Sequence, residues 1–166
     1  MTSTRGRRRW PPGRRATTTD TTTTTATGSV ITERTERTGT RTARALWTGG
    51  WRCEVDAGGF ALVVDEPASV GGTGTGPMPT DLLLASLSSC FALALAWAAR
   101  KQGVELPDLE VSATGTYAGP KFSAIEITVE SSLPQEQLVP LFAPAKRACY
   151  VSNTFAHAPD ISVTLA

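Results

Sequence analysis

The sequence is poor in the residues that build metal sites and disulfide frameworks. It has one histidine and three cysteines in 166 residues. Cys53, Cys90 and Cys149 are too far apart to form the closely spaced Cys/His pairs of a metal site, so we expect no metal. An odd and low number of cysteines is also unlike a secreted disulfide scaffold. We therefore predict free thiols in a cytoplasmic protein.

The first part of the chain lacks apolar residues. Residues 1–30 contain nothing like the apolar core of a secretory signal. Residues 1–38, rich in arginine and threonine, cannot bury enough apolar surface to fold, so we predict a disordered arm followed by one domain over residues 39–166. Six arginines and no acid lie in residues 1–15, which leaves ten basic and fifteen acidic side chains elsewhere. Such an acidic domain argues against a nucleic-acid partner.

Short strand patterns lead to a glycine-rich loop. Weak alternation over Thr40–Trp47 predicts one strand, and the runs Trp51–Val55 and Phe60–Asp65 predict a hairpin around a Gly-Gly pair. A loop with four glycines and three prolines follows over Glu66–Pro79. It lacks the GK[ST] ending of a phosphate-binding loop, and we expect a flexible lid near the site.

One uncharged run dominates the middle of the chain. The 18 residues Leu82–Ala99 carry no charge and predict a helix that Thr80 or Asp81 caps and Gly103 ends. Its length is at the lower edge of a membrane span, but serines in mid-run and amphipathic strands on either side favour a soluble core. Because a helix that is apolar all round must be buried all round, we predict an obligate homodimer and no membrane.

The C-terminal half alternates in two strands and then becomes helical. Leu109–Ala113 and Ile125–Val129 predict the strands, and Pro134 opens a helix to about Cys149 that two internal prolines must kink or interrupt. A closing strand is predicted over Ile161–Leu165. The order β-β-β-α-β-β-α-β predicts an α+β fold.

Three motifs resemble those of one protein family. Val64–Pro67 (VDEP), with the later Gly-Gly and Gly-Pro pairs, resembles the family's approach to its central helix. Pro79–Cys90 (PTDLLLASLSSC) resembles the start of that helix, and Cys149–Thr154 (CYVSNT) resembles the second-cysteine motif. By their order and spacing over residues 44–166, the chain is identified as a member of the OsmC/Ohr-like superfamily of organic hydroperoxide and osmotically inducible proteins. The resemblance implies an intertwined homodimer in which antiparallel sheets wrap two long central helices.

The resemblance also implies a thiol-dependent peroxidase that reduces organic hydroperoxides. Cys90 is then the peroxidatic cysteine and Cys149 the resolving cysteine. Peroxide oxidises the first thiol to a sulfenic acid, the second condenses with it, and an external dithiol or lipoylated reductant resets the pair, so no bound cofactor is needed. Such a disulfide requires Cα atoms within about 4.4–6.8 Å. The residues expected to line the peroxide pocket are Phe91, Phe155 and Trp97.

A cation must activate the first cysteine, because burial among leucine and alanine raises a thiol pKa. The family places a catalytic arginine in the N-terminal strands, and Arg52 is the favoured candidate over Arg44. In the organic-hydroperoxide branch an acid ten residues before the first cysteine holds that arginine. Here that position is Thr80, so Asp81 or Glu66 is expected to orient the arginine.

Two other functions stay open at this stage. A non-catalytic or ligand-binding dimer of the same fold is favoured by the threonine in place of the family's acid. A thiol redox sensor would use the same cysteines. An enzyme loses both thiols to one disulfide per hydroperoxide and turns over with a dithiol, whereas a binding protein keeps them reduced.

Overall fold

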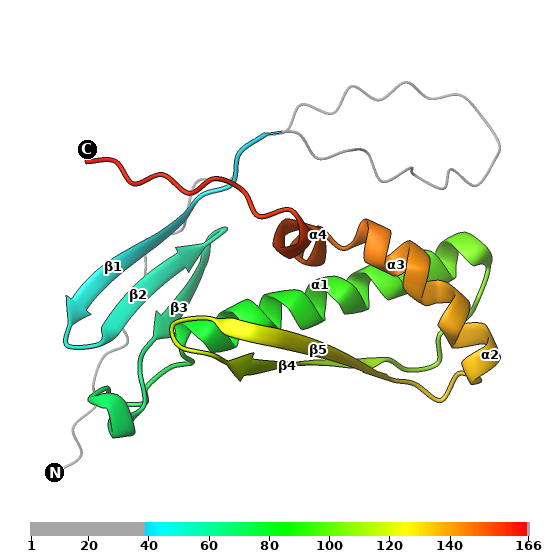
Figure 1. Cartoon of the computed structure of the whole chain (residues 1–166), viewed down its shortest axis with the longest axis horizontal. Coiled ribbons are helices and arrows are strands. Elements are labelled where there is room, and N and C mark those ends of the chain that lie inside the picture. Colours follow the sequence, from blue (N-terminus) through cyan, green and yellow to red (C-terminus); the bar gives the residue numbers. More distant parts are fainter. Residues whose placement is uncertain (1–38, 166) are drawn as a thin grey trace, which may run out of the picture. The chain divides into compact units, whose positions relative to one another are not determined.

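The computed structural model describes residues 39–165, so the arm predicted over residues 1–38 lies outside the described residues. The chain divides into two compact units, one ending at Met78 and one beginning at Pro79 (Figure 1). Each unit has its own architecture.

The first unit contains an antiparallel sheet in the order β1-β2-β3. Its strands are β1 (Ala43–Gly49), β2 (Arg52–Ala57) and β3 (Phe60–Val64). Strands β2 and β3 pair up to Ala57 and Phe60, so the turn between them has only two residues. Both are glycines with positive φ, of 65° and 89°, as the favoured two-residue hairpin turn requires. The predicted hairpin is confirmed.

The sheet has one charged face and one apolar face. Arg44 lies opposite Asp56 in the pairing of β1 with β2, so their side chains share a face. Glu54 and Arg52 are two and four residues from Asp56 on the same strand and share that face too. The other face carries the apolar residues Trp47, Cys53, Val55, Phe60, Leu62 and Val64.

The second unit is built on one long helix. Helix α1 (Pro79–Gln102) is followed by the antiparallel hairpin β4 (Glu110–Tyr117) and β5 (Phe122–Glu130). In Figure 1, α1 lies along this hairpin, and the later helices lie alongside α1. The predicted central helix and both predicted strands are confirmed.

The second predicted helix is interrupted rather than continuous. It consists of α2 (Gln135–Leu138), the 3₁₀ turn η2 (Val139–Leu141) and α3 (Phe142–Ala148), and a further helix α4 (Tyr150–Ala156) follows. One proline falls in η2 and the other in the first turn of α3, where a missing N–H removes no helical hydrogen bond. The prediction that the helix ends near Cys149 is confirmed, but α4 was not predicted.

The closing strand predicted over Ile161–Leu165 is wrong for the single chain. These residues form no strand within the part of the chain that the structure describes. The side chains of Ile161, Val163 and Leu165 are 90%, 94% and 100% exposed. A strand needs a neighbour to satisfy its N–H and C=O groups, and here none is paired with it.

Helix α1 is the core helix of the second unit. It is the one helix in residues 39–165 that is long and apolar enough to cross a membrane by length and composition. Ala94, Leu95 and Ala98 are nevertheless buried in a core that also contains Leu141 and Ala145. The prediction that α1 is buried on all sides is not met by one chain, because another side remains exposed.

Candidate functional site

The fold brings two cysteines together on α1 and at the start of α4. Cys90 lies in the middle of α1, and Cys149 lies at the break between α3 and α4. Both are free thiols; Cys149 is fully buried and Cys90 is half-buried. The two side chains are close enough for the Cys149 thiol to contribute to the raised pKa of Cys90. The two thiols that a disulfide would join are therefore neighbours in the fold.

The break that positions Cys149 is held by residues of its own motif. Cys149 has an extended backbone (φ −81°, ψ 106°), and its Sγ accepts a hydrogen bond from the Ser152 N–H at 3.5 Å. The Asn153 side-chain amide donates to the Arg147 carbonyl at 3.0 Å and thereby links α4 to the end of α3. The CYVSNT motif thus fixes the direction of the second thiol.

The environment of Cys90 raises its pKa. Burial is the largest cause; the Val151 and Tyr150 N–H groups oppose it, while the Cys149 thiol adds to it. None of these influences comes from a cationic side chain. Cys90 is therefore protonated at neutral pH unless a cation is brought to it.

A cavity of about 620 Å³ lies within the second unit, and its wall includes neighbours of both cysteines, although neither cysteine itself lines it. Phe91, which follows Cys90, lies on its wall, as does Ser152, whose N–H contacts the Cys149 sulfur. Phe155 also lines it, so both phenylalanines proposed for a substrate pocket share one cavity. The remaining wall comes from α1, β5 and α3 and includes Leu87, Phe122, Ile125, Ile127 and Lys146.

Trp97, the third residue expected to line a peroxide pocket, is not part of the wall of this cavity. It lies nearly two helical turns beyond Cys90 and packs against the core of the second unit. The Lys101 ammonium lies over its ring, 5.9 Å from the ring centroid. This displacement along α1 keeps the indole away from the residues that line the cavity.

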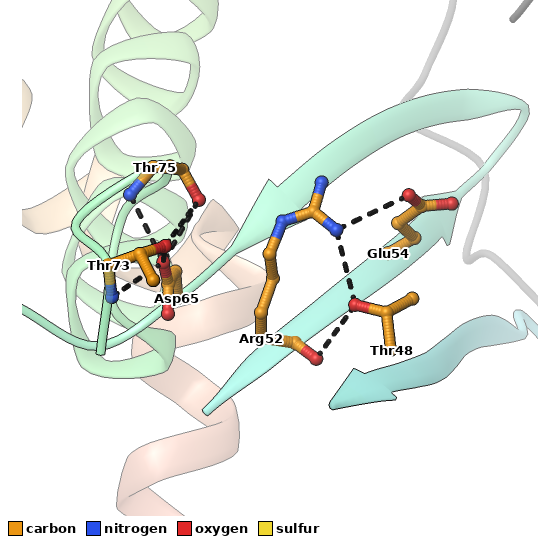
Figure 2. A network of polar contacts seen from close by, with 6 residues as sticks. All are labelled: Thr48, Arg52, Glu54, Asp65, Thr73 and Thr75. Carbon is orange, nitrogen blue, oxygen red and sulfur yellow. Dashed lines mark hydrogen bonds and ion pairs between the residues drawn. The ribbon is translucent and has the colours of Figure 1, made fainter. Parts of the chain in front are cut away.

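The favoured arginine has an acidic partner that the sequence did not indicate. Arg52 Nη1 lies 3.5 Å from Glu54 Oε1 and donates a hydrogen bond to Thr48 Oγ1 at 3.2 Å (Figure 2). Thr48 belongs to β1, and Arg52 and Glu54 belong to β2, all in the first unit. Arg44 lies on the same charged face of the sheet. The alternation of β2 could have indicated Glu54, because residues two apart on a strand share a face.

The glycine-rich loop is an ordered structure, and the prediction of a flexible lid is corrected. Asp65 is buried and its Oδ2 accepts hydrogen bonds from the N–H and hydroxyl groups of both Thr73 and Thr75 (Figure 2). Its Oδ1 accepts from the Glu66 N–H at 2.9 Å. The Thr73 hydroxyl is the main reason why the pKa of Asp65 lies far below its usual range, although burial opposes the shift.

Thr80 links α1 to the hairpin. Its Oγ1 accepts a hydrogen bond from the Tyr117 hydroxyl at 2.7 Å, which joins the first turn of α1 to the end of β4. Asp81 also lies in this first turn. The position at which the family's peroxidases carry an acid therefore has a neutral hydroxyl group with a structural partner.

Comparison with known proteins gives the family. The sequence model of the OsmC-like protein family matches residues 72–164, more than half of the chain. No curated protein matches the chain in sequence. Many solved structures resemble it. One is an organic hydroperoxide resistance protein OsmC from Legionella pneumophila, described as a predicted redox protein, with 26% identity and a TM-score of 0.56 over 72% of this chain and 91% of that one.

Two further structures show the same fold at lower identity. An organic hydroperoxide resistance protein from Vibrio cholerae, solved with captopril in one of its active sites, has 23% identity and a TM-score of 0.60 over 76% of this chain and 92% of that one. An OsmC-like protein from Mycoplasma pneumoniae has 16% identity and a TM-score of 0.61 over 72% and 89%. With its paired thiols, its long central helix and this match, the chain belongs to the OsmC-like protein family.

Proposed function

We propose that this protein is a thiol-dependent peroxidase that reduces organic hydroperoxides in the cytoplasm. The observation that carries the proposal is the proximity of the Cys90 and Cys149 thiols, whose neighbours Phe91 and Ser152 line a largely apolar cavity. An apolar wall suits the organic part of a hydroperoxide, since burial of apolar surface favours its binding. Membership of a family with organic hydroperoxide resistance proteins supports the same activity.

The proposed reaction uses both sulfurs. The Cys90 thiolate attacks the terminal oxygen of ROOH, the O–O bond breaks, and the alkoxide leaves and takes a proton to become ROH. Cys90 is then a sulfenic acid. The Cys149 thiolate attacks that sulfur and displaces hydroxide, which leaves as water, and a disulfide forms. An external dithiol or a lipoylated protein reduces this disulfide by two exchange steps and is itself oxidised.

The raised pKa of Cys90 means that the first step needs a cation. We propose Arg52 for this role and Arg44 as the next candidate, from the same chain or from a partner chain. Arg52 is supported by its fixed geometry, since Glu54 and Thr48 both engage its guanidinium. A held guanidinium loses less side-chain entropy when it meets a thiolate than a free one does.

We also propose that the protein works as a homodimer. The apolar face of the sheet leaves Trp47 68% and Phe60 75% exposed, and α1 leaves Leu93 72% exposed. Apolar surface of this extent on several elements marks an association site. A second copy of the chain would cover these side chains and could give a neighbour to the unpaired segment at Ile161–Leu165.

Three cysteine variants test the peroxidase. With an organic hydroperoxide and a dithiol, we expect Cys90→Ser to abolish turnover. Cys149→Ser should complete one turnover and then accumulate over-oxidised Cys90, visible by mass spectrometry. Cys53→Ser, on the strand β2, is the matched control and should retain activity.

The same experiment separates the peroxidase from a binding protein of the same fold. One equivalent of hydroperoxide should convert both thiols of the wild-type protein to a Cys90–Cys149 disulfide. Two thiols that stay reduced in the presence of hydroperoxide would refute the enzyme and favour a ligand-binding dimer. An active Cys90→Ser combined with an inactive Cys53→Ser would refute the assignment of the site.

A further inference from the structure

The cavity beside the thiols carries a single charge. Of the residues that line it, all within the described chain, Lys146 is the only ionisable one. Leu87, Phe91, Ile125 and other apolar side chains make up most of the wall. No aspartate or glutamate lines it, so the cavity combines apolar surface with an uncompensated positive charge.

The fold places the backbone of Lys146 next to that of Cys149 and leaves its side chain exposed. Lys146 is in the last turn of α3, and its carbonyl accepts a hydrogen bond from the Cys149 N–H at 3.4 Å. Among the described residues, the side chains of Arg52 and Glu54 form an ion pair with an N···O distance below 4 Å, whereas Lys146 forms no ion pair. Its ammonium, on a flexible apolar stem, is thus available to a ligand in the cavity.

We propose that Lys146 makes the cavity selective for hydroperoxides that carry a carboxylate on an apolar chain. This inference rests on the proposed peroxidase function. The apolar wall binds the chain, and the ammonium pairs with the carboxylate while the hydroperoxide group faces Cys90. A neutral hydroperoxide with the same chain gains the apolar contacts but leaves the ammonium without a partner.

The test changes the charge of the ligand and keeps its size nearly constant. We propose to measure kcat/KM for a fatty-acid hydroperoxide and for its methyl ester, which differ in one charge. The wild-type protein should prefer the acid. Lys146→Gln should lower the acid-to-ester ratio roughly three- to tenfold, the range of a partly exposed charged hydrogen bond. Lys146→Glu should make the ester the better substrate.

The neighbouring cation provides the matched control. Arg147→Gln removes the same charge from the same turn of α3, but the Arg147 side chain does not line the cavity. It should leave the acid-to-ester ratio unchanged. An equal fall in the ratio for Arg147→Gln and Lys146→Gln would show a general effect of net charge and overturn the inference.

Other outcomes distinguish a failure of this inference from a failure of the proposed peroxidase function. Equal rates for acid and ester in the wild-type protein would overturn the role of Lys146 and leave the peroxidase standing. A changed KM for the dithiol alone would place Lys146 in reductant binding and overturn the inference. If no hydroperoxide is reduced, calorimetry with a medium-chain fatty acid and its methyl ester still decides, since Lys146→Gln must weaken binding of the acid only.

Discussion

Asp65 shows how far one side chain can organise a loop. Its carboxylate accepts hydrogen bonds from Glu66, Thr73 and Thr75, on both sides of the 3₁₀ turn η1 (Ala68–Val70). Sequence indicated a flexible segment here, because glycine and proline mark turns without indicating which side chain closes them. Gly72 adds a second constraint, since a Cβ there would collide with the Glu66 carbonyl.

The lowered pKa of Asp65 predicts a specific pH dependence. A carboxyl whose folded pKa is depressed contributes stability that is complete above its unfolded pKa, about 3.9, and is lost as the pH falls through the folded value. Asp65→Asn should therefore be less stable than the wild type from pH 7 to pH 5. The difference should narrow progressively below about pH 4.

Urea unfolding of both proteins at a series of pH values measures this difference. Asp108, whose pKa is lowered mainly by the Ser132 hydroxyl, is present in both proteins and cancels. Thr73→Val is the graded control, because it removes one donor and should make the loss of stability on acidification smaller and complete at a higher pH. A gap between wild type and Asp65→Asn that stays constant down to pH 2 would contradict the assignment.

At this scale the sequence indicates the candidate site residues better than their partners. Cys90, Cys149 and the two phenylalanines of the cavity could be predicted because they lie in or next to recognisable motifs. The alternation of β2 could have indicated Glu54, whereas the place of Lys146 on the cavity wall depends on packing that only the folded chain supplies. Trp97 lies on the same helix as Cys90 but outside the wall of this cavity.

Among the elements, the short helix α4 is linked to the end of α3 by a side-chain amide. The Asn153 side chain bonds to the Arg147 carbonyl across the extended Cys149, so it joins two helices that share no helical hydrogen bond there. The prolines of this region do indicate an interrupted helix. They do not indicate that the decisive break comes at Cys149, because that break is set by side-chain bonds within the CYVSNT motif.

Removal of this amide should slow the second chemical step. Asn153→Ala should cost about 1 kcal/mol of stability, as one lost hydrogen bond does. It should also slow disulfide formation after oxidation of Cys90, while the initial oxidation keeps its rate, as stopped-flow measurements with single equivalents of peroxide can show. Thr154→Val, which loses only a hydroxyl bond to Tyr150 within α4, is the control. Equal rates of disulfide formation in all three proteins would refute the positioning role.

For the whole molecule, the exposed apolar side chains show which surfaces a single chain leaves uncovered. The hydrophobic pattern predicted a central helix enclosed on all sides, and one chain encloses only part of it. The strand predicted over Ile161–Leu165 does not form for a related reason. Its residues alternate between apolar and polar, but no strand within the described residues of the same chain pairs with it. Sequence periodicity indicates which residues need burial and is silent on which chain provides it.

A charge on the exposed side of α1 should weaken the dimer. Leu93→Glu would place a carboxylate in the apolar contact, and we expect the dimer dissociation constant to rise roughly tenfold or more. Gln102→Glu, at the exposed end of the same helix, is the control and should leave association unchanged. Sedimentation equilibrium measures both, and a wild-type protein that is monomeric at micromolar concentration would contradict the proposal.

The sulfur of Cys149 is both a thiol in contact with Cys90 and the acceptor that caps α4. A change in its bonding therefore reaches the backbone of the last helix directly, with no intervening side chain. This coupling makes α4 a natural attachment point for a fluorophore in a biosensor. In the proposed peroxidase, a dye near Phe155 would translate each cycle of oxidation and reduction into an optical signal.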